Sequence, residues 1–91
     1  MTIDELIDRA ATTTRRAQAA MAEDLGIKPA RISEWKSGKR KPEAGEIAYF
    51  AQQAGMTGID VFRTVAEIEQ QLRPAYARVW QKALEQAVPK S

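Results

Sequence analysis

The sequence predicts an all-α fold of five helices with an additional sixth helix at the C-terminal end. Apolar residues recur at helical spacing in each of the six segments, and glycine and proline residues fall between segments. The chain has 91 residues, 44% of them hydrophobic, which is enough for one domain with its own core. We therefore expect one small helical domain that needs neither disulfides nor metals.

A capping box predicts where the first helix begins. Thr2 and Glu5 have Ser/Thr-x-x-Glu spacing, so each side chain can satisfy a backbone N–H of the other residue. The apolar stripe of this helix is expected to consist of Ile3, Leu6, Ile7 and Ala10. The helix should break at the threonine run of residues 12–14, whose hydroxyl groups offer an N-cap for the next helix.

Two short helices joined by a tight turn are expected at residues 15–25 and 29–37. Gly26 is placed to end the first of them, because glycine tolerates the positive φ that closes a helix. Pro29 suits the first turn of the second, where its missing N–H would have no partner anyway. The side chains expected to pack between the two helices are Met21, Ala22, Leu25, Ile32 and Trp35.

Three further helices are expected at about residues 43–53, 57–72 and 75–87. Pro74 should interrupt the helical pattern between the last two, because a proline inside a helix destabilises that helix by ~3 kcal/mol or more. The aromatic side chains of Tyr49 and Phe50 are expected in the core, because aromatic residues at helical spacing normally pack there. Trp35 is expected in the core as well, and stacking on a sugar is the alternative.

The net charge of +2 is unevenly distributed along the chain. Six basic residues and one acidic residue give residues 28–41 a charge of +5, which leaves −3 for the rest. A local basic stripe on an acidic body suits a polyanion bound on one side, because each neutralised phosphate releases counterions. The alternative is a solvated loop, since lysines are commonest on surfaces. Because the stripe covers the second of the two short helices and the residues after it, we interpret it as a nucleic-acid contact.

The paired helices and the residues after them carry a spaced set: Gln18, Met21, Ala22, Leu25, Gly26, Ile27, Ile32, Ser33, Trp35, Gly38, Arg40 and Pro42. In one ungapped register this set resembles the Cro/C1-type (XRE family) helix-turn-helix of phage repressors and bacterial regulators. The resemblance covers roughly residues 3–57 and implies a domain whose second motif helix enters the DNA major groove. Pro29 departs from the pattern, because many relatives carry a polar base reader there, so that contact must move to its neighbours.

The resemblance, together with the outward position of the side chains, predicts two sets of contacts with double-stranded DNA. Base contacts are expected from Lys28, Ala30, Arg31, Ser33 and Glu34. Phosphate contacts are expected from Arg15, Arg16, Gln18, Ser37, Lys39, Arg40 and Lys41. For Arg15 and Arg16 the alternative is an ordinary surface position. For Arg31 and Glu34 the alternative is a surface ion pair between the two.

We expect no enzymatic activity, no metal, no cofactor and no small-molecule ligand. The chain has no Cys and no His, and it lacks the Gly-x-x-x-x-Gly-Lys-Ser/Thr loop of many nucleotide-binding enzymes. The carboxylate pairs Asp4 with Asp8 and Glu67 with Glu69 are expected to be solvated charges. No apolar run approaches the ~20 residues of a membrane span, and the absence of Cys suits the cytoplasm, where we expect the protein.

The chain divides into a helix-turn-helix core, residues 1–57, and a C-terminal helical extension, residues 58–91. The extension is expected to form a homodimer, because one reading helix spans too few base pairs to select a site alone. The expected interface residues are Tyr76, Val79, Trp80 and Leu84. The alternative is that the last helix folds back on its own core. The predicted function is a small transcriptional repressor of phage, prophage or plasmid type on a symmetric operator. The alternatives are an antitoxin-like autoregulator and a protein-interaction module.

Overall fold

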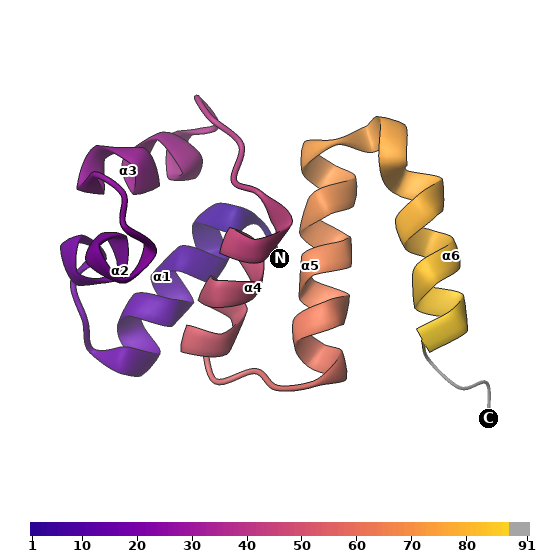
Figure 1. Cartoon of the computed structure of the whole chain (residues 1–91), viewed down its shortest axis with the longest axis horizontal. Coiled ribbons are helices and arrows are strands. Elements are labelled where there is room, and N and C mark those ends of the chain that lie inside the picture. The colour runs from indigo at the N-terminus through magenta and orange to yellow at the C-terminus, as the bar shows by residue number, and fades with distance from the viewer. Residues whose placement is uncertain (88–91) are drawn as a thin grey trace.

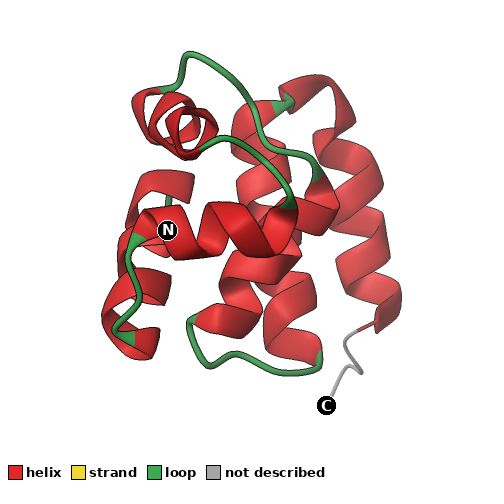
Figure 2. Ribbon diagram, turned by 60° about the vertical axis from the view of Figure 1, so that its left-hand side comes forward, coloured by secondary structure: helices red, strands yellow, loops and turns green. Residues whose placement is uncertain are grey.

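The computed structural model describes residues 1–87, which form helices joined by short loops (Figure 2). The elements are α1 (Ile3–Thr14), α2 (Gln18–Leu25), α3 (Pro29–Ser37), α4 (Ala44–Gln53), α5 (Ile59–Leu72), a 3₁₀ turn η1 (Pro74–Tyr76) and α6 (Ala77–Ala87). No strand occurs within residues 1–87, so the all-α prediction is confirmed. The end of the predicted C-terminal extension, residues 88–91, lies outside the described residues.

The helices form a cluster with a helical hairpin at one end (Figure 1). α1 packs against α3 and α4, α2 packs against α3, and α4 packs against α5. α6 runs back along the outer side of α5, so that α5 lies between α6 and the rest of the molecule (Figure 1). The long axis measures 40 Å, with α2 and α3 at one end and α6 at the other.

One hydrophobic core joins α1 through α5. Its buried side chains are Ile3, Leu6, Ile7, Ala10, Met21, Ala22, Ile32, Trp35, Ile47, Phe50, Ala51, Val65 and Ile68. Trp35 is 2% exposed and meets Phe50 edge to face, with ring centroids 6.0 Å apart, so its predicted core position is confirmed. Phe50 is fully buried, and Tyr49 is partly buried against it, with the two ring centroids 5.2 Å apart. Val65 and Ile68 lie in this core, so α5 packs as part of the same domain as α1 through α4.

Local signals place several helix ends as the sequence predicts. Thr2 and Glu5 form the expected capping box, with the Glu5 N–H donating to Thr2 Oγ1 at 3.2 Å. α4 begins with a second capping box in which the Glu43 N–H donates to the Glu46 carboxylate at 2.8 Å. Pro74 ends the regular helix before it, since α5 stops at Leu72 and the chain continues in a 3₁₀ turn.

The start of α2 differs from the prediction. Thr14 is still helical, and its hydroxyl donates to the Ala10 carbonyl at 2.7 Å, a bond to the previous turn that keeps it within α1. α1 ends at Arg15, which has left-handed backbone angles, and α2 begins only at Gln18. The threonine run therefore caps no following helix, because the N-cap of α2 is Ala17, which makes no side-chain hydrogen bond.

Candidate nucleic-acid interface

The turn between α2 and α3 is closed by Gly26. Its φ of 67° lies in the left-handed region, which glycine adopts without the strain a side chain would bring. The Ile27 N–H donates to the Ala22 carbonyl at 3.0 Å, which satisfies the end of α2. Lys28 is the N-cap of α3, and Pro29 occupies its first turn as predicted. The two short helices therefore meet through a turn of three residues, 26–28.

One face of α3 is buried and the other faces solvent. Ile32 and Trp35 fix the inner face, since they are 0% and 2% exposed. Four of the five predicted base contacts are exposed: Lys28, Ala30, Arg31 and Ser33. Glu34, the fifth, is partly covered. The structure therefore brings the predicted base contacts together on the outer face of a single helix.

A basic loop follows α3 and borders its outer face. Gly38 ends the helix with a φ of 81°, and Lys39, Arg40 and Lys41 after it are all exposed. Pro42 is fully buried and anchors the far end of this loop. The predicted phosphate contact Ser37 lies at the end of α3, is exposed, and donates its hydroxyl to the Glu34 carbonyl at 3.1 Å.

Lys36 does not belong to the exposed basic surface, although the sequence counts it within the stripe. Its ammonium donates to Asp8 at 2.5 Å and lies 3.7 Å from Asp4, so it connects α3 to α1. The hydrogen bond to Asp8 raises the pKa of Lys36. Asp4 and Asp8, which were expected to be solvated charges, are 54% and 59% exposed, and both carboxylates also flank this lysine. Their charge is used to hold α3 against α1.

Four of the stripe's cations have no carboxylate partner within residues 1–87: Lys28, Arg31, Lys39 and Lys41. All four are exposed: Lys28 at the N-cap of α3, Arg31 on α3, and Lys39 and Lys41 on the loop after it. These four residues, called the basic rim below, form the part of the +5 stripe that can meet an anion without breaking an ion pair.

Glu34 pairs with Arg40 and not with Arg31. Its carboxylate accepts from Arg40 Nε at 2.9 Å, and its backbone carbonyl accepts from the N–H groups of Lys39 and Arg40. The expected alternative, an ion pair between Arg31 and Glu34, is therefore not the one that forms.

Arg16 is held by a cluster of side chains beside α2. Its guanidinium donates to both oxygens of Asp24, at 2.6 and 3.1 Å, and to the Ala20 carbonyl at 3.2 Å. The Tyr49 hydroxyl from α4 donates to the same carboxylate at 2.5 Å. The bonds from Arg16 and Tyr49 lower the pKa of Asp24 to about 2, while burial and the bond to Asp24 raise the pKa of Tyr49 to about 12.

The predicted phosphate contacts Arg15, Arg16 and Gln18 thus lie in three different settings. Arg15 is exposed at the end of α1, and Gln18 is partly covered in the first turn of α2. The sequence predicted that Arg15 and Arg16 would begin this helix, but both precede α2, which begins at Gln18. Arg16 lies between the helices and joins α2 to α4 through Asp24 and Tyr49, a connection that nothing in the local sequence signals.

Arg73 connects the basic loop to the C-terminal hairpin. Its guanidinium donates to Glu69 at 2.5 Å and to the Pro42 carbonyl at 3.0 Å, and it lies 3.7 Å from Glu43. The end of α5 is therefore tied to the segment that follows the basic loop. The sequence predicts a helix break at Arg73 but not this connection, because Pro42 and Glu43 are about thirty positions away.

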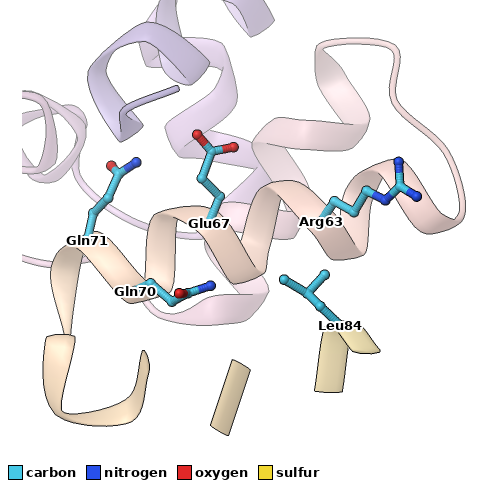
Figure 3. A pocket seen from close by; sticks show the side chains of 5 residues that line it. All are labelled: Arg63, Glu67, Gln70, Gln71 and Leu84. Atoms are coloured by element: carbon cyan, nitrogen blue, oxygen red, sulfur yellow. The ribbon is translucent and has the colours of Figure 1, made fainter. Parts of the chain in front are cut away.

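α6 divides the predicted dimer stripe between two environments. Trp80 packs on Phe62 of α5, with ring centroids 6.1 Å apart, and so lies within the fold of one chain. Leu84 is partly covered and borders an open groove of about 750 Å³ together with α5 side chains (Figure 3). Tyr76 and Val79 are 57% and 65% exposed. Only these two members of the stripe remain largely open to a partner.

The groove between α5 and α6 has a mixed lining. Figure 3 shows four polar side chains on α5 and one apolar side chain on α6: Arg63, Glu67, Gln70, Gln71 and Leu84. Glu67 and Gln71 also contact the N-terminal residue, since Glu67 pairs with the Met1 amino group and Gln71 donates to the Met1 carbonyl at 2.9 Å. The groove therefore lies where the N-terminus meets the hairpin, away from α3.

Within the described part of the chain, no group of three or more potential ligand side chains is placed to hold a metal ion. None of the helices described is both long and apolar enough to cross a membrane. The outer face of α3 and the loop after it bring together five exposed basic residues: Lys28, Arg31, Lys39, Arg40 and Lys41.

No protein-family model matches this chain, and comparisons with curated proteins and with solved structures also give no match.

Proposed function

We propose that this protein is a sequence-specific DNA-binding regulator that places α3 in the major groove of double-stranded DNA. The observation that carries the proposal is the outer face of α3, where Arg31 and Ser33 are exposed and the basic rim borders them. The buried residues Ile32 and Trp35 hold that face outward. The resemblance of residues 3–57 to Cro/C1-type repressors supports the same function.

The dimensions of α3 suit the groove. An α-helix with its side chains is ~10–12 Å across, and the major groove, ~12 Å wide, admits one such helix; the nine residues of α3 extend about 13 Å along its axis. Arg31 offers the fork of donors that recognises guanine, and Ser33 can donate or accept. The three lysines of the basic rim, Lys28, Lys39 and Lys41, would follow the phosphates on either side, which gives affinity without sequence preference.

We further propose that the regulator binds a symmetric operator as a homodimer. A single α3 covers about four base pairs, which is too few to select one site in a genome. Tyr76 at the end of η1 and Val79 on α6 are exposed large side chains available for a second copy. The form of regulator proposed is a small cytoplasmic repressor of phage, prophage or plasmid type, which acts by occupying its operator.

Selection of bound sequences from a pool of random duplexes tests the proposal. The expected result is enrichment of one motif with two-fold symmetry. If the three lysines of the basic rim, Lys28, Lys39 and Lys41, each neutralise a phosphate, affinity should fall roughly fortyfold per protomer between ~50 and ~200 mM salt. Lys82→Ala, on exposed α6 at the far end of the molecule, is the control and should select the same motif. A pool that stays random at every salt concentration contradicts the proposal.

A further inference from the structure

The acidic side chain on the outer face of α3 is held by the loop that follows the helix. Glu34 Oε2 accepts from Arg40 Nε at 2.9 Å, and the Glu34 carbonyl accepts from the Lys39 and Arg40 N–H groups at 2.9 and 3.2 Å. The Glu34 side chain is 25% exposed, whereas that of Arg40 is 56% exposed. A duplex approaching α3 therefore meets the guanidinium more readily than the carboxylate that holds it.

Arg40 lies beside Arg31. Both side chains border two hollows on this face, one of about 410 Å³ over the α2–α3 turn and one of about 340 Å³ toward α4. Glu34 borders the first hollow together with both arginines. Its negative charge offsets the repulsion that two neighbouring guanidinium groups would otherwise feel. The pair Glu34–Arg40 therefore allows two arginines to occupy one small surface.

We infer that Glu34 is a positioning residue and that Arg40, held by it, is a second base reader beside Arg31. The bond to Glu34 uses the Nε donor of Arg40 and leaves the N–H groups of its two terminal nitrogens for a ligand. Guanine presents O6 and N7 in the major groove, and a guanidinium can donate to both acceptors at once. The ligand atoms assigned to Arg40 are therefore O6 and N7 of a guanine.

This assignment exchanges the roles that the sequence suggests for the two residues. Glu34 was expected to accept from a cytosine, and Arg40 was expected to meet a phosphate. A carboxylate that already accepts from Arg40 would have to give up that bond to reach cytosine. The inference rests on the proposed function, because it needs a duplex in contact with α3, but it concerns only which side chains discriminate between bases.

The test uses the motif selected by the wild-type protein and a panel of duplexes with each base pair changed in turn. Arg40→Ala should weaken binding to the motif about tenfold and abolish preference at one G·C pair. Glu34→Ala should relax preference at that same pair. The double variant should bind no more weakly than Arg40→Ala alone, because Glu34 acts through Arg40. Glu34→Gln, whose amide oxygen can still accept from Arg40, should restore part of the preference.

Two results would overturn the inference while leaving the proposed function intact. If Arg40→Ala weakens all duplexes alike and reduces the salt slope by ~1, Arg40 meets a phosphate. If Glu34→Ala relaxes a different base pair and its effect adds to that of Arg40→Ala, Glu34 reads a base itself. A wild-type protein that selects no motif at all would overturn both proposals. Circular dichroism and thermal melting of each variant, both residues being at the surface, establish that the compared proteins are folded.

Discussion

At the scale of single residues, several charged side chains that look available in the sequence are already engaged in the fold. Arg16 is bonded to Asp24, Lys36 to Asp8, and Arg40 to Glu34. Each pair joins segments that are apart in the sequence. Within the stripe of residues 28–41, the bonds of Lys36 and Arg40 leave only the basic rim without a carboxylate partner.

The cluster of Arg16, Asp24 and Tyr49 predicts how stability depends on acid pH. The pKa of Asp24 is lowered from 3.8 to about 2, mainly by its bond with Arg16. The ionised carboxylate therefore contributes its full stabilisation of the fold above about pH 4. This stabilisation is lost progressively as pH falls from about 4 through about 2, because the unfolded chain takes up the proton first.

We therefore expect Asp24→Asn to melt at a lower temperature than the wild type at pH 7, with a difference that shrinks toward pH 2. Glu23→Gln is the matched control, because Glu23 lies next to Asp24 on α2, is exposed, and has no cation partner within residues 1–87. Its difference from the wild type should be small at both pH values. A gap between Asp24→Asn and the wild type that is constant from pH 7 to pH 2 would contradict the account.

At the scale of secondary-structure elements, the helices follow from local rules. The Thr2 and Glu5 capping box, Gly26, Pro29 and Pro74 each act within one turn of chain, so the sequence carries their effect directly. The six predicted segments match the six observed α-helices to within a few residues. The largest error, three residues at the start of α2, arises because Thr14 bonds back into α1.

What the sequence could not predict depends on contacts between elements. The partner of Glu34 is six residues away, Asp8 is 28 residues from Lys36, and Pro42, one of the partners of Arg73, is 31 residues from it. No periodicity indicates such pairs, since they form only after the helices have packed. For the same reason, the apolar stripe of α6 could be recognised from the sequence, but its division between α5 and solvent could not.

The packing of α6 on α5 predicts unequal effects for two neighbouring substitutions. Trp80→Ala should destabilise the fold by roughly 2–3 kcal/mol, below the ~3–5 kcal/mol typical of a fully buried aromatic, because Trp80 is partly covered against Phe62. Val79→Ala should change stability by about 0.5 kcal/mol or less, since Val79 is 65% exposed. Urea unfolding of both variants measures the two values. Equal losses would contradict the observed division of the stripe.

At the scale of the whole molecule, α3 and α6 lie at opposite ends of the long axis (Figure 1). Between them, Arg73 joins the end of α5 to Pro42, beyond the basic loop. Pairing of two copies through α6 would leave both α3 helices free for DNA. The homodimer stays a prediction, and its residues are now Tyr76 and Val79.

Sedimentation of a Tyr76→Ala, Val79→Ala double variant tests this pairing. We expect the wild type to sediment as a dimer and the variant as a folded monomer, with much weaker binding to a symmetric duplex and little change in melting temperature. Gln81→Ala is the control and should remain dimeric. Gln81 is an exposed residue of the same helix, and its amide donates to Gln70 of α5 within one chain. If the double variant sediments as the wild type does, the interface lies elsewhere.

We expect the outer face of α3 to discriminate between bases, while Lys39 and Lys41 of the loop after it contact DNA phosphates. The measurement that tests this expectation most directly compares Arg31→Ala and Lys39→Ala on the selected motif and on a scrambled duplex, across a range of salt. Arg31→Ala should lose ~1–3 kcal/mol of binding free energy on the motif and less on the scrambled duplex. Lys39→Ala should weaken both alike and reduce the salt slope by ~1. Equal losses for Arg31→Ala on both duplexes would contradict this expectation, because Arg31 would then be a phosphate contact.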